Sequence, residues 1–96
     1  MTSLLSEPLF KTGQLVLTPG FSALAGDNHI IIAYALVRRH ERGDWGDDNM
    51  DSAINDENLK TDDMGFLSNY TVNGEVVWVI TDYGRETTTI LLPDEY

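Results

Sequence analysis

The sequence predicts an α+β fold in which a three- to four-stranded antiparallel sheet, ending in a C-terminal meander, packs against two or three helices. Three features predict it: a hairpin signal at Asn73-Gly74, a further apolar strand that ends at Pro93, and helix start and stop signals in the first half of the chain. With 96 residues, the chain is expected to form a single domain, residues 1–96, in which residues 1–12 are a loosely ordered N-terminal arm.

The first elements are expected to be a short strand and a helix of about two turns. The apolar run at residues 15–17 is typical of a strand, and it is cut off by Thr18 and Pro19, which suit the cap and the first position of a helix. This helix is predicted to carry Phe21 and Leu24 toward the core and to stop at the Gly-Asp-Asn cluster that follows.

The next apolar stretch, residues 30–37, is ambiguous because buried strands and buried helices look alike over this length. Three consecutive isoleucines favour a strand. Basic residues at 38–42 followed by Gly43 favour a helix, since cations gather at the negative C-terminal end of the helix dipole and glycine suits the position after it. We predict a helix over residues 29–41.

Residues 44–63 form an acidic segment with eight carboxylates and one base, Lys60. A helix over about residues 49–60 is predicted here, with Asp47 or Asp48 capping its start. The side chains expected to face the core are Met50, Ala53 and Ile54. Most of the surface of this helix would be carboxylate.

The C-terminal third gives the clearest pattern. Residues 66–72 and 75–81 flank Asn73-Gly74, the dipeptide that best fits a two-residue type I′ turn. After a second turn, residues 87–92 supply a third strand, which Pro93 ends by withholding its amide donor.

The central strand of this meander is apolar on both faces. Val76, Trp78 and Ile80 share one face, and the alternating positions Val77 and Val79 share the other. We therefore expect both faces of the sheet to be covered, one of them by helices.

The totals exclude several classes of protein. Sixteen acidic residues against six basic ones give a net charge of −10, which repels nucleic acid and anionic membranes, so neither is an expected partner. The absence of cysteine excludes disulfides and thiolate metal sites and indicates a reducing, cytoplasmic environment. Residues 1–10 show no basic start followed by a long apolar run, and no run of about 18 apolar residues occurs, so secretion is not expected.

No enzyme signature is found in the chain: a phosphate-binding glycine loop, a nucleophile elbow and a His-Glu-x-x-His pair are all absent, so we expect no enzyme and no cofactor. His40 near Asp44 is a candidate base, but nothing completes a constellation, and a histidine near a helix end is commonly a cap. The carboxylates of residues 44–51 lack the spacing of a calcium loop, so no metal site is predicted. Trp45 fits a core anchor, with an interface hot spot as the alternative.

Several ordered motifs suggest a family. They are Arg38-Arg39-His40, Gly43-Asp44-Trp45-Gly46-Asp47, Asn55-Asp56-Glu57-Asn58-Leu59, Ser68-Asn69-Tyr70, Trp78-Val79-Ile80-Thr81, Arg85 and Thr87-Thr88-Thr89-Ile90-Leu91-Leu92-Pro93-Asp94-Glu95-Tyr96. Over residues 15–96 the chain resembles a family of small uncharacterised proteins encoded on plasmids and other mobile elements. It departs from that family at residues 25–34, where the family has a more polar helix entry. The resemblance implies a genetic context and carries over no activity, substrate or catalytic residue.

The resulting functional hypothesis is a non-enzymatic, acidic interaction protein of a mobile genetic element. Its partner would be a basic host surface, and as a nucleic-acid mimic it would inhibit a defence system such as restriction or CRISPR. The residues expected to bind the partner are Asp44, Trp45, Asp47, Asp48, Asp51, Asp56 and Glu57. The alternative is a plasmid-maintenance or antitoxin-like accessory that binds a protein through an apolar surface, and a homodimer is compatible with either.

Overall fold

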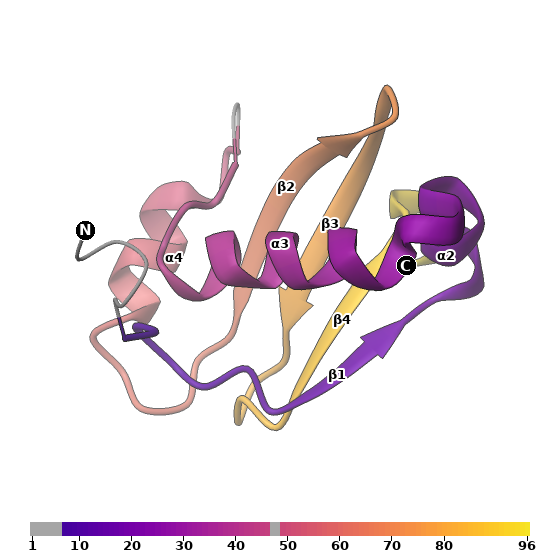
Figure 1. Cartoon of the computed structure of the whole chain (residues 1–96). Coiled ribbons are helices and arrows are strands. Elements are labelled where there is room, and N and C mark those ends of the chain that lie inside the picture. The colour runs from indigo at the N-terminus through magenta and orange to yellow at the C-terminus, as the bar shows by residue number, and fades with distance from the viewer. Residues whose placement is uncertain (1–6, 47–48) are drawn as a thin grey trace.

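The computed structural model describes residues 7–46 and 49–96, and a four-stranded sheet forms its centre (Figure 1). In chain order the elements are β1 (Gln14–Leu17), α2 (Pro19–Ala25), the 3-10 helix η1 (Gly26–Asn28), α3 (His29–Glu41), α4 (Ser52–Asn58), β2 (Phe66–Val72), β3 (Glu75–Thr81), β4 (Thr87–Leu91) and the 3-10 helix η2 (Pro93–Glu95). The predicted α+β class is confirmed.

The strands lie in the order β1-β4-β3-β2. β2, β3 and β4 form the predicted antiparallel meander, whereas β1 pairs with β4 in parallel. The sheet is therefore mixed and not wholly antiparallel. A parallel neighbour is allowed here because α2 and α3 carry the chain back over the sheet before the meander begins.

Helix α3 crosses one face of the sheet, and its bounds are those predicted for residues 29–41 (Figure 1). It buries Leu36 and Val37 in the same apolar cluster as Val77 and Val79 of β3, both of which are fully buried. The segment is therefore a helix and not a strand. A 13-residue helix buries one stripe of its side chains against the sheet and satisfies its backbone hydrogen bonds internally.

The start of α2 is held by side chains, as its sequence predicts. The Thr18 hydroxyl accepts a hydrogen bond from the Phe21 amide at 3.3 Å, and Pro19 begins the helix. The C-terminal end of the chain adds a second clamp: Glu95 accepts hydrogen bonds from the Thr18 hydroxyl at 2.6 Å and the Gly20 amide at 2.9 Å. These bonds, that of Thr18 first, lower the pKa of Glu95.

The hairpin between β2 and β3 has the predicted turn. Asn73 and Gly74 have φ of 49° and 82°, as a type I′ turn requires of both central residues. The Asn73 side chain also donates a hydrogen bond to the Leu24 carbonyl at 3.0 Å, which ties the hairpin to α2.

The acidic segment differs from its prediction. Helix α4 is limited to seven residues, and Met50 and Ile54 are 95% and 58% exposed, so the expectation that they and Ala53 face the core is wrong. The buried residue is Asn55, whose side chain bonds the backbone of β2, as described below. An edge strand needs partners for its backbone groups, and an amide meets that need where an isoleucine cannot. The predicted caps Asp47 and Asp48 lie outside the described residues.

The face of the sheet away from α3 is only partly covered, contrary to expectation. Val76 is 43% exposed, and Trp78 and Ile80 are half-buried. Cover comes at one end, where the Tyr96 ring meets Trp78 edge-on with centroids 5.8 Å apart. Apolar surface therefore remains accessible on this outer face.

The consecutive helices of Pro19–Glu41, 23 residues together, are long and apolar enough to cross a membrane by length and composition alone. Core helices of soluble proteins meet the same criterion, and Phe21, Ala33 and Leu36 of this run are buried against the sheet. These contacts pack the run onto the sheet of a compact fold, and 28% of its most apolar window is buried.

Candidate protein-binding surface

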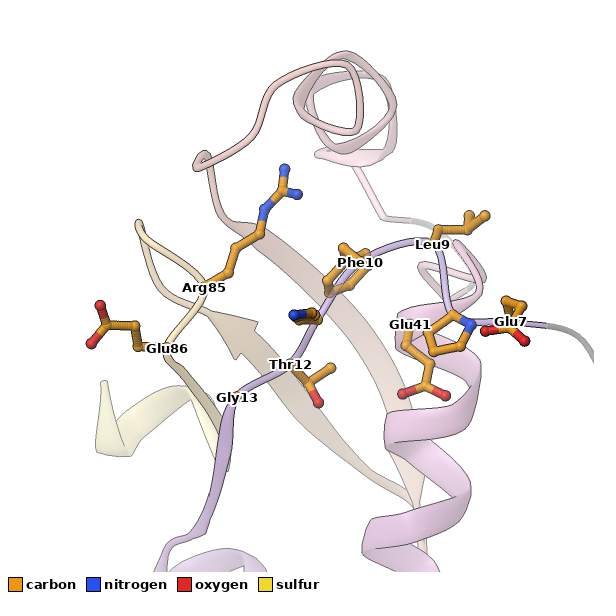
Figure 2. A pocket seen from close by; sticks show the side chains of 10 residues that line it. Glu7, Leu9, Phe10, Thr12, Gly13, Glu41, Arg85 and Glu86 are labelled. Atoms are coloured by element: carbon orange, nitrogen blue, oxygen red, sulfur yellow. The ribbon is translucent and has the colours of Figure 1, made fainter.

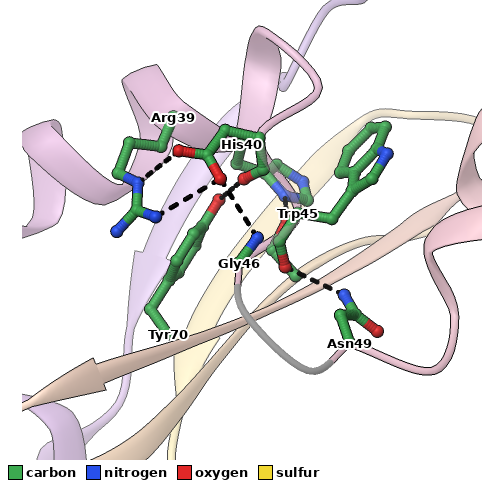
Figure 3. Close-up of polar contacts among 8 residues, drawn as sticks. Arg39, His40, Trp45, Gly46, Asn49 and Tyr70 are labelled. Carbon is green, nitrogen blue, oxygen red and sulfur yellow. Dashed lines mark hydrogen bonds and ion pairs between the residues drawn. The ribbon is translucent and has the colours of Figure 1, made fainter.

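The loop that follows α3 is shaped by the helix end. Gly43 has a φ of 82° and donates to the His40 carbonyl at 3.1 Å, and Asp44 donates to the Arg39 carbonyl at 3.0 Å, which is the Schellman pattern. This turn brings the Asp44 carboxylate back to Arg39, whose Nε donates to Oδ2 at 2.6 Å and whose Nη2 donates to Oδ1 at 3.3 Å (Figure 3). The hydrogen bond from Arg39 lowers the pKa of Asp44.

Strand β2 holds the other side of this loop. The Tyr70 hydroxyl donates to the Asp44 carbonyl at 2.6 Å (Figure 3). The Asn69 amide donates to the Trp45 carbonyl at 2.9 Å. Burial raises the pKa of Tyr70, so the phenol remains a donor. Gly46 has a φ of 91°, and a Cβ there would collide with the Asn69 carbonyl, so this position requires glycine.

Trp45 lies in the core. It is 5% exposed and stacks on Phe66 with centroids 5.3 Å apart and an interplanar angle of 10°. Phe10 stacks on Phe66 at 4.0 Å and is also buried, so the N-terminal stretch contributes to the core from this residue onward. The indole N–H of Trp45 donates to Asp56 Oδ1 at 2.9 Å, which ties the acidic segment to this second cluster.

His40 is fully buried beneath the same aromatic cluster, with its ring edge-on to Phe10 at 5.2 Å. Nδ1 lies 2.6 Å from Ser68 Oγ and Nε2 lies 2.9 Å from Thr81 Oγ1. Thr81 Oγ1 lies 2.7 Å from Thr88 Oγ1. Burial lowers the pKa of His40 from 6.5 to about 3, so the ring is neutral at physiological pH.

The tautomer of His40 follows from the direction of this chain of hydrogen bonds. The Thr88 hydroxyl donates its hydrogen bond to the Thr12 carbonyl at 2.7 Å. In the contact between Thr81 and Thr88, the Thr81 hydroxyl must therefore be the donor. Thr81 then accepts from His40, which places the ring proton on Nε2, and Ser68 donates to Nδ1. Both ring nitrogens are satisfied and shielded from solvent, which leaves this histidine no access to a substrate.

Helix α4 lies against the edge of β2 through its amide side chains. Asn55 Nδ2 donates to the Leu67 carbonyl at 2.7 Å, and its Oδ1 accepts from the Leu67 amide at 3.1 Å. Arg85 holds the end of the segment by donating to the Asn58 carbonyl at 2.8 Å and the Met64 carbonyl at 2.9 Å, with its guanidinium 4.8 Å from the centre of the Phe66 ring.

This arrangement creates a shallow groove of about 290 Å³ on the outer face of the sheet, which we call the acidic groove. Its apolar floor includes Leu67 and Ile80, and carboxylates stand at Asp51 and Asp82. The lining residues are Asp51, Ile54, Asn55, Asn58, Gly65, Phe66, Leu67, Ile80, Thr81, Asp82 and Tyr83. Tyr83 is 73% exposed, and its hydrogen bond to Asp63 raises its pKa.

The residues predicted to bind a partner are not equally available. Asp51 lines the acidic groove, and the side chain of Glu57 is 73% exposed next to Lys60, 3.2 Å away. Asp44 forms an ion pair with Arg39, and Asp56 accepts a hydrogen bond from the Trp45 indole N–H. Trp45 itself is buried. Asp47 and Asp48 lie outside the described residues.

Sequence reasoning missed part of the groove. Leu67, Ile80, Asp82 and Tyr83 come from the meander, nine or more residues along the chain from the end of α4. The available signal was the second apolar face of β3, which requires cover or a partner.

A larger cavity, of about 890 Å³, lies between residues 7–13 and the turn before β4 (Figure 2). Glu7, Glu41 and Glu86 line it together with Lys11 and Arg85. The guanidinium of Arg85 is directed toward the end of α4 and bonded there, so it is committed to the fold. The mixed charge defines no ligand class.

Within residues 7–46 and 49–96, no group of three or more His, Asp or Glu side chains is placed to hold a metal ion. The chain matches no protein-family profile, no curated protein and no solved structure. Fold and surface therefore define a class only, an acidic α+β protein with an accessible groove.

Proposed function

We propose that this is a non-enzymatic binding protein that places its acidic groove on a basic surface of another protein. The observation that carries the proposal is the make-up of the groove, an apolar floor of Leu67 and Ile80 with the carboxylates of Asp51 and Asp82 beside it. Lysine and arginine have long apolar stems that end in a cation, so they match such a groove in both parts.

The charge of the whole chain supports this choice of partner. A net charge of −10 attracts a basic surface over long distances and speeds the encounter. Glu57 lies exposed on α4, between the groove residues Ile54 and Asn58, so several carboxylates can meet one basic patch.

Surfaces rich in lysine and arginine commonly bind nucleic acid, and carboxylates can occupy the positions of phosphates there. We therefore propose a nucleic-acid-binding protein of a host defence system, of the restriction or CRISPR type, as the partner class, with binding in the cytoplasm. The resemblance to mobile-element proteins supports this context. The maintenance or antitoxin-like alternative is favoured by the partly uncovered outer face of the sheet, where Val76 is exposed and Trp78 is half-buried.

The proposal is tested by capture from a bacterial lysate with three immobilised proteins. The test variant Asp51→Asn/Asp82→Asn/Glu57→Gln removes both carboxylates of the groove and that of the neighbouring Glu57. The matched control removes three exposed charges elsewhere through Glu75→Gln/Glu86→Gln/Asp94→Asn, so both variants change the net charge from −10 to −7.

Wild type and control should retain a common set of proteins that duplex DNA elutes, and the groove variant should lose them. Equal retention by all three proteins would refute a role for the groove. Retained proteins that DNA cannot elute would refute the nucleic-acid-binding class of partner.

A further inference from the structure

The outer face of α3 is apolar and uncovered by any other described element (Figure 1). Ile30, Ile31 and Tyr34 are 50%, 71% and 64% exposed, and Ala35 is exposed beside them. A helix that covers a sheet in a soluble protein normally turns polar residues outward. Four apolar side chains grouped at adjacent positions indicate a face that has a partner.

The two ends of this face carry opposite charges. Asp27, in η1, is exposed just before the N-terminus of α3, and Arg38 is exposed in its last turns. Asp27, Ile31, Tyr34 and Arg38 are spaced by four, three and four residues, the spacing of a helix–helix contact seam.

We propose that two copies of the chain associate through this face, with their α3 helices antiparallel about a two-fold axis between Ile32 and Ala33. That axis places Ile31 of one copy against Tyr34 of the other, with Ile30 and Ala35 flanking the seam on its two sides. It also places Asp27 of each copy beside Arg38 of the other. The two Asp27–Arg38 pairs formed in this way lie about 17 Å apart along the helix. The four seam positions, apolar at the centre and oppositely charged at the ends, are matched by one operation, as an isologous dimer requires.

The choice of a second copy rests on this self-complementarity. A net charge of −10 on each chain opposes association in general, but α3 itself carries two arginines and one glutamate, so repulsion is least at this face. The acidic groove remains free, because Leu67 and Ile80 alternate along their strands with residues that face α3. The dimer is thus independent of the proposed function.

The interface is small. A 13-residue helix is about 20 Å long, and a stable interface buries about 800 Å² on each partner, more than one helix face provides. We therefore expect a weak dimer that dissociates in the micromolar to millimolar range.

Sedimentation velocity over that range tests the proposal. The mass of wild type should rise from 10.7 kDa toward twice that value with concentration. Ile31→Lys should remain monomeric. Asp27→Arg and Arg38→Asp should each weaken association about tenfold, because each creates two like-charge contacts, and the double variant D27R/R38D should restore it.

Matched controls exclude a general charge effect. Glu57→Lys, on α4, and Lys60→Glu, just after it, make the same charge changes as Asp27→Arg and Arg38→Asp and should associate as wild type does. Thermal melting confirms that each variant is folded. A wild type that stays monomeric at millimolar concentration, no restoration in D27R/R38D, or equal weakening by the controls would overturn the proposal. So would a monomer that sediments with phosphatidylcholine vesicles and loses this in Ile31→Lys, which would assign the face to a membrane.

Discussion

Lowering the pH should destabilise the protein through one buried residue, His40. The pKa of this ring is 6.5 when unfolded and about 3 when folded, because burial disfavours the charged form. Below pH 6.5 the unfolded chain therefore binds a proton that the folded chain does not. The stability contributed by neutral His40 is fully present above the unfolded pKa and is lost progressively as the pH falls toward 3.

The size of the effect follows from the same two values. Between about pH 7 and about pH 5 the free energy of unfolding should fall by about 2 kcal/mol, with a limiting slope of about 1.4 kcal/mol per pH unit. Carboxylates with ordinary pKa values titrate mostly below this window, so the histidine dominates it. Urea unfolding at several pH values measures the change.

Two variants test whether His40 causes this pH dependence of the free energy of unfolding. His40→Gln should be less stable at neutral pH and should lose most of the slope, whereas His29→Gln, which leaves the buried ring in place, should keep it. Nitrogen-15 spectra of the folded wild type should show a neutral ring protonated on Nε2. A slope that persists in His40→Gln, or a ring protonated on Nδ1, would refute the assigned chain of hydrogen bonds.

Three further substitutions test the local geometry by denaturant unfolding. Gly46→Ala should cost about 3 kcal/mol, since its φ of 91° and the nearby Asn69 carbonyl leave no room for a Cβ, and near-wild-type stability would contradict the loop geometry. Asn73→Pro should cost about 3 kcal/mol because proline cannot adopt a positive φ, while Asn73→Gly should cost about 1 kcal/mol; equal effects would rule out the type I′ turn. Asn55→Ala should cost about 2 kcal/mol by leaving the Leu67 amide and carbonyl without partners, and no loss would mean that α4 does not hold the edge of β2.

The fold was predictable where local chemistry decides structure. Asn73-Gly74 requires positive φ at both residues, and Thr18-Pro19 carries its own cap, so neighbouring residues suffice to identify the hairpin and the start of α2. Helix α3 was harder to predict because its apolar run covers both its buried and its exposed sides. The parallel pairing of β1 with β4 depends on contacts distant in sequence, which periodicity does not encode.

The candidate site was less predictable because tertiary contacts determine which carboxylates remain available. In the sequence, Asp44 and Asp56 look like unpaired surface acids. In the structure, Asp44 forms an ion pair with Arg39, and Asp56 accepts a hydrogen bond from the indole N–H of the buried Trp45. The opposite error occurred at Ile54, since an isoleucine on a predicted amphipathic helix is expected to be buried. Its exposure follows from Asn55, whose amide pairs with the edge strand and turns the helix accordingly.

The most direct test of the proposed binding is calorimetry of the wild-type protein with a purified partner from the capture experiment, at a series of salt concentrations. Affinity should fall steeply as salt rises through the physiological range, and the variant Asp51→Asn/Asp82→Asn/Glu57→Gln should bind weakly with a much smaller salt dependence. The control Glu75→Gln/Glu86→Gln/Asp94→Asn should retain most of the wild-type affinity. An affinity that is insensitive to salt, or unchanged in the groove variant, would contradict recognition by the acidic groove.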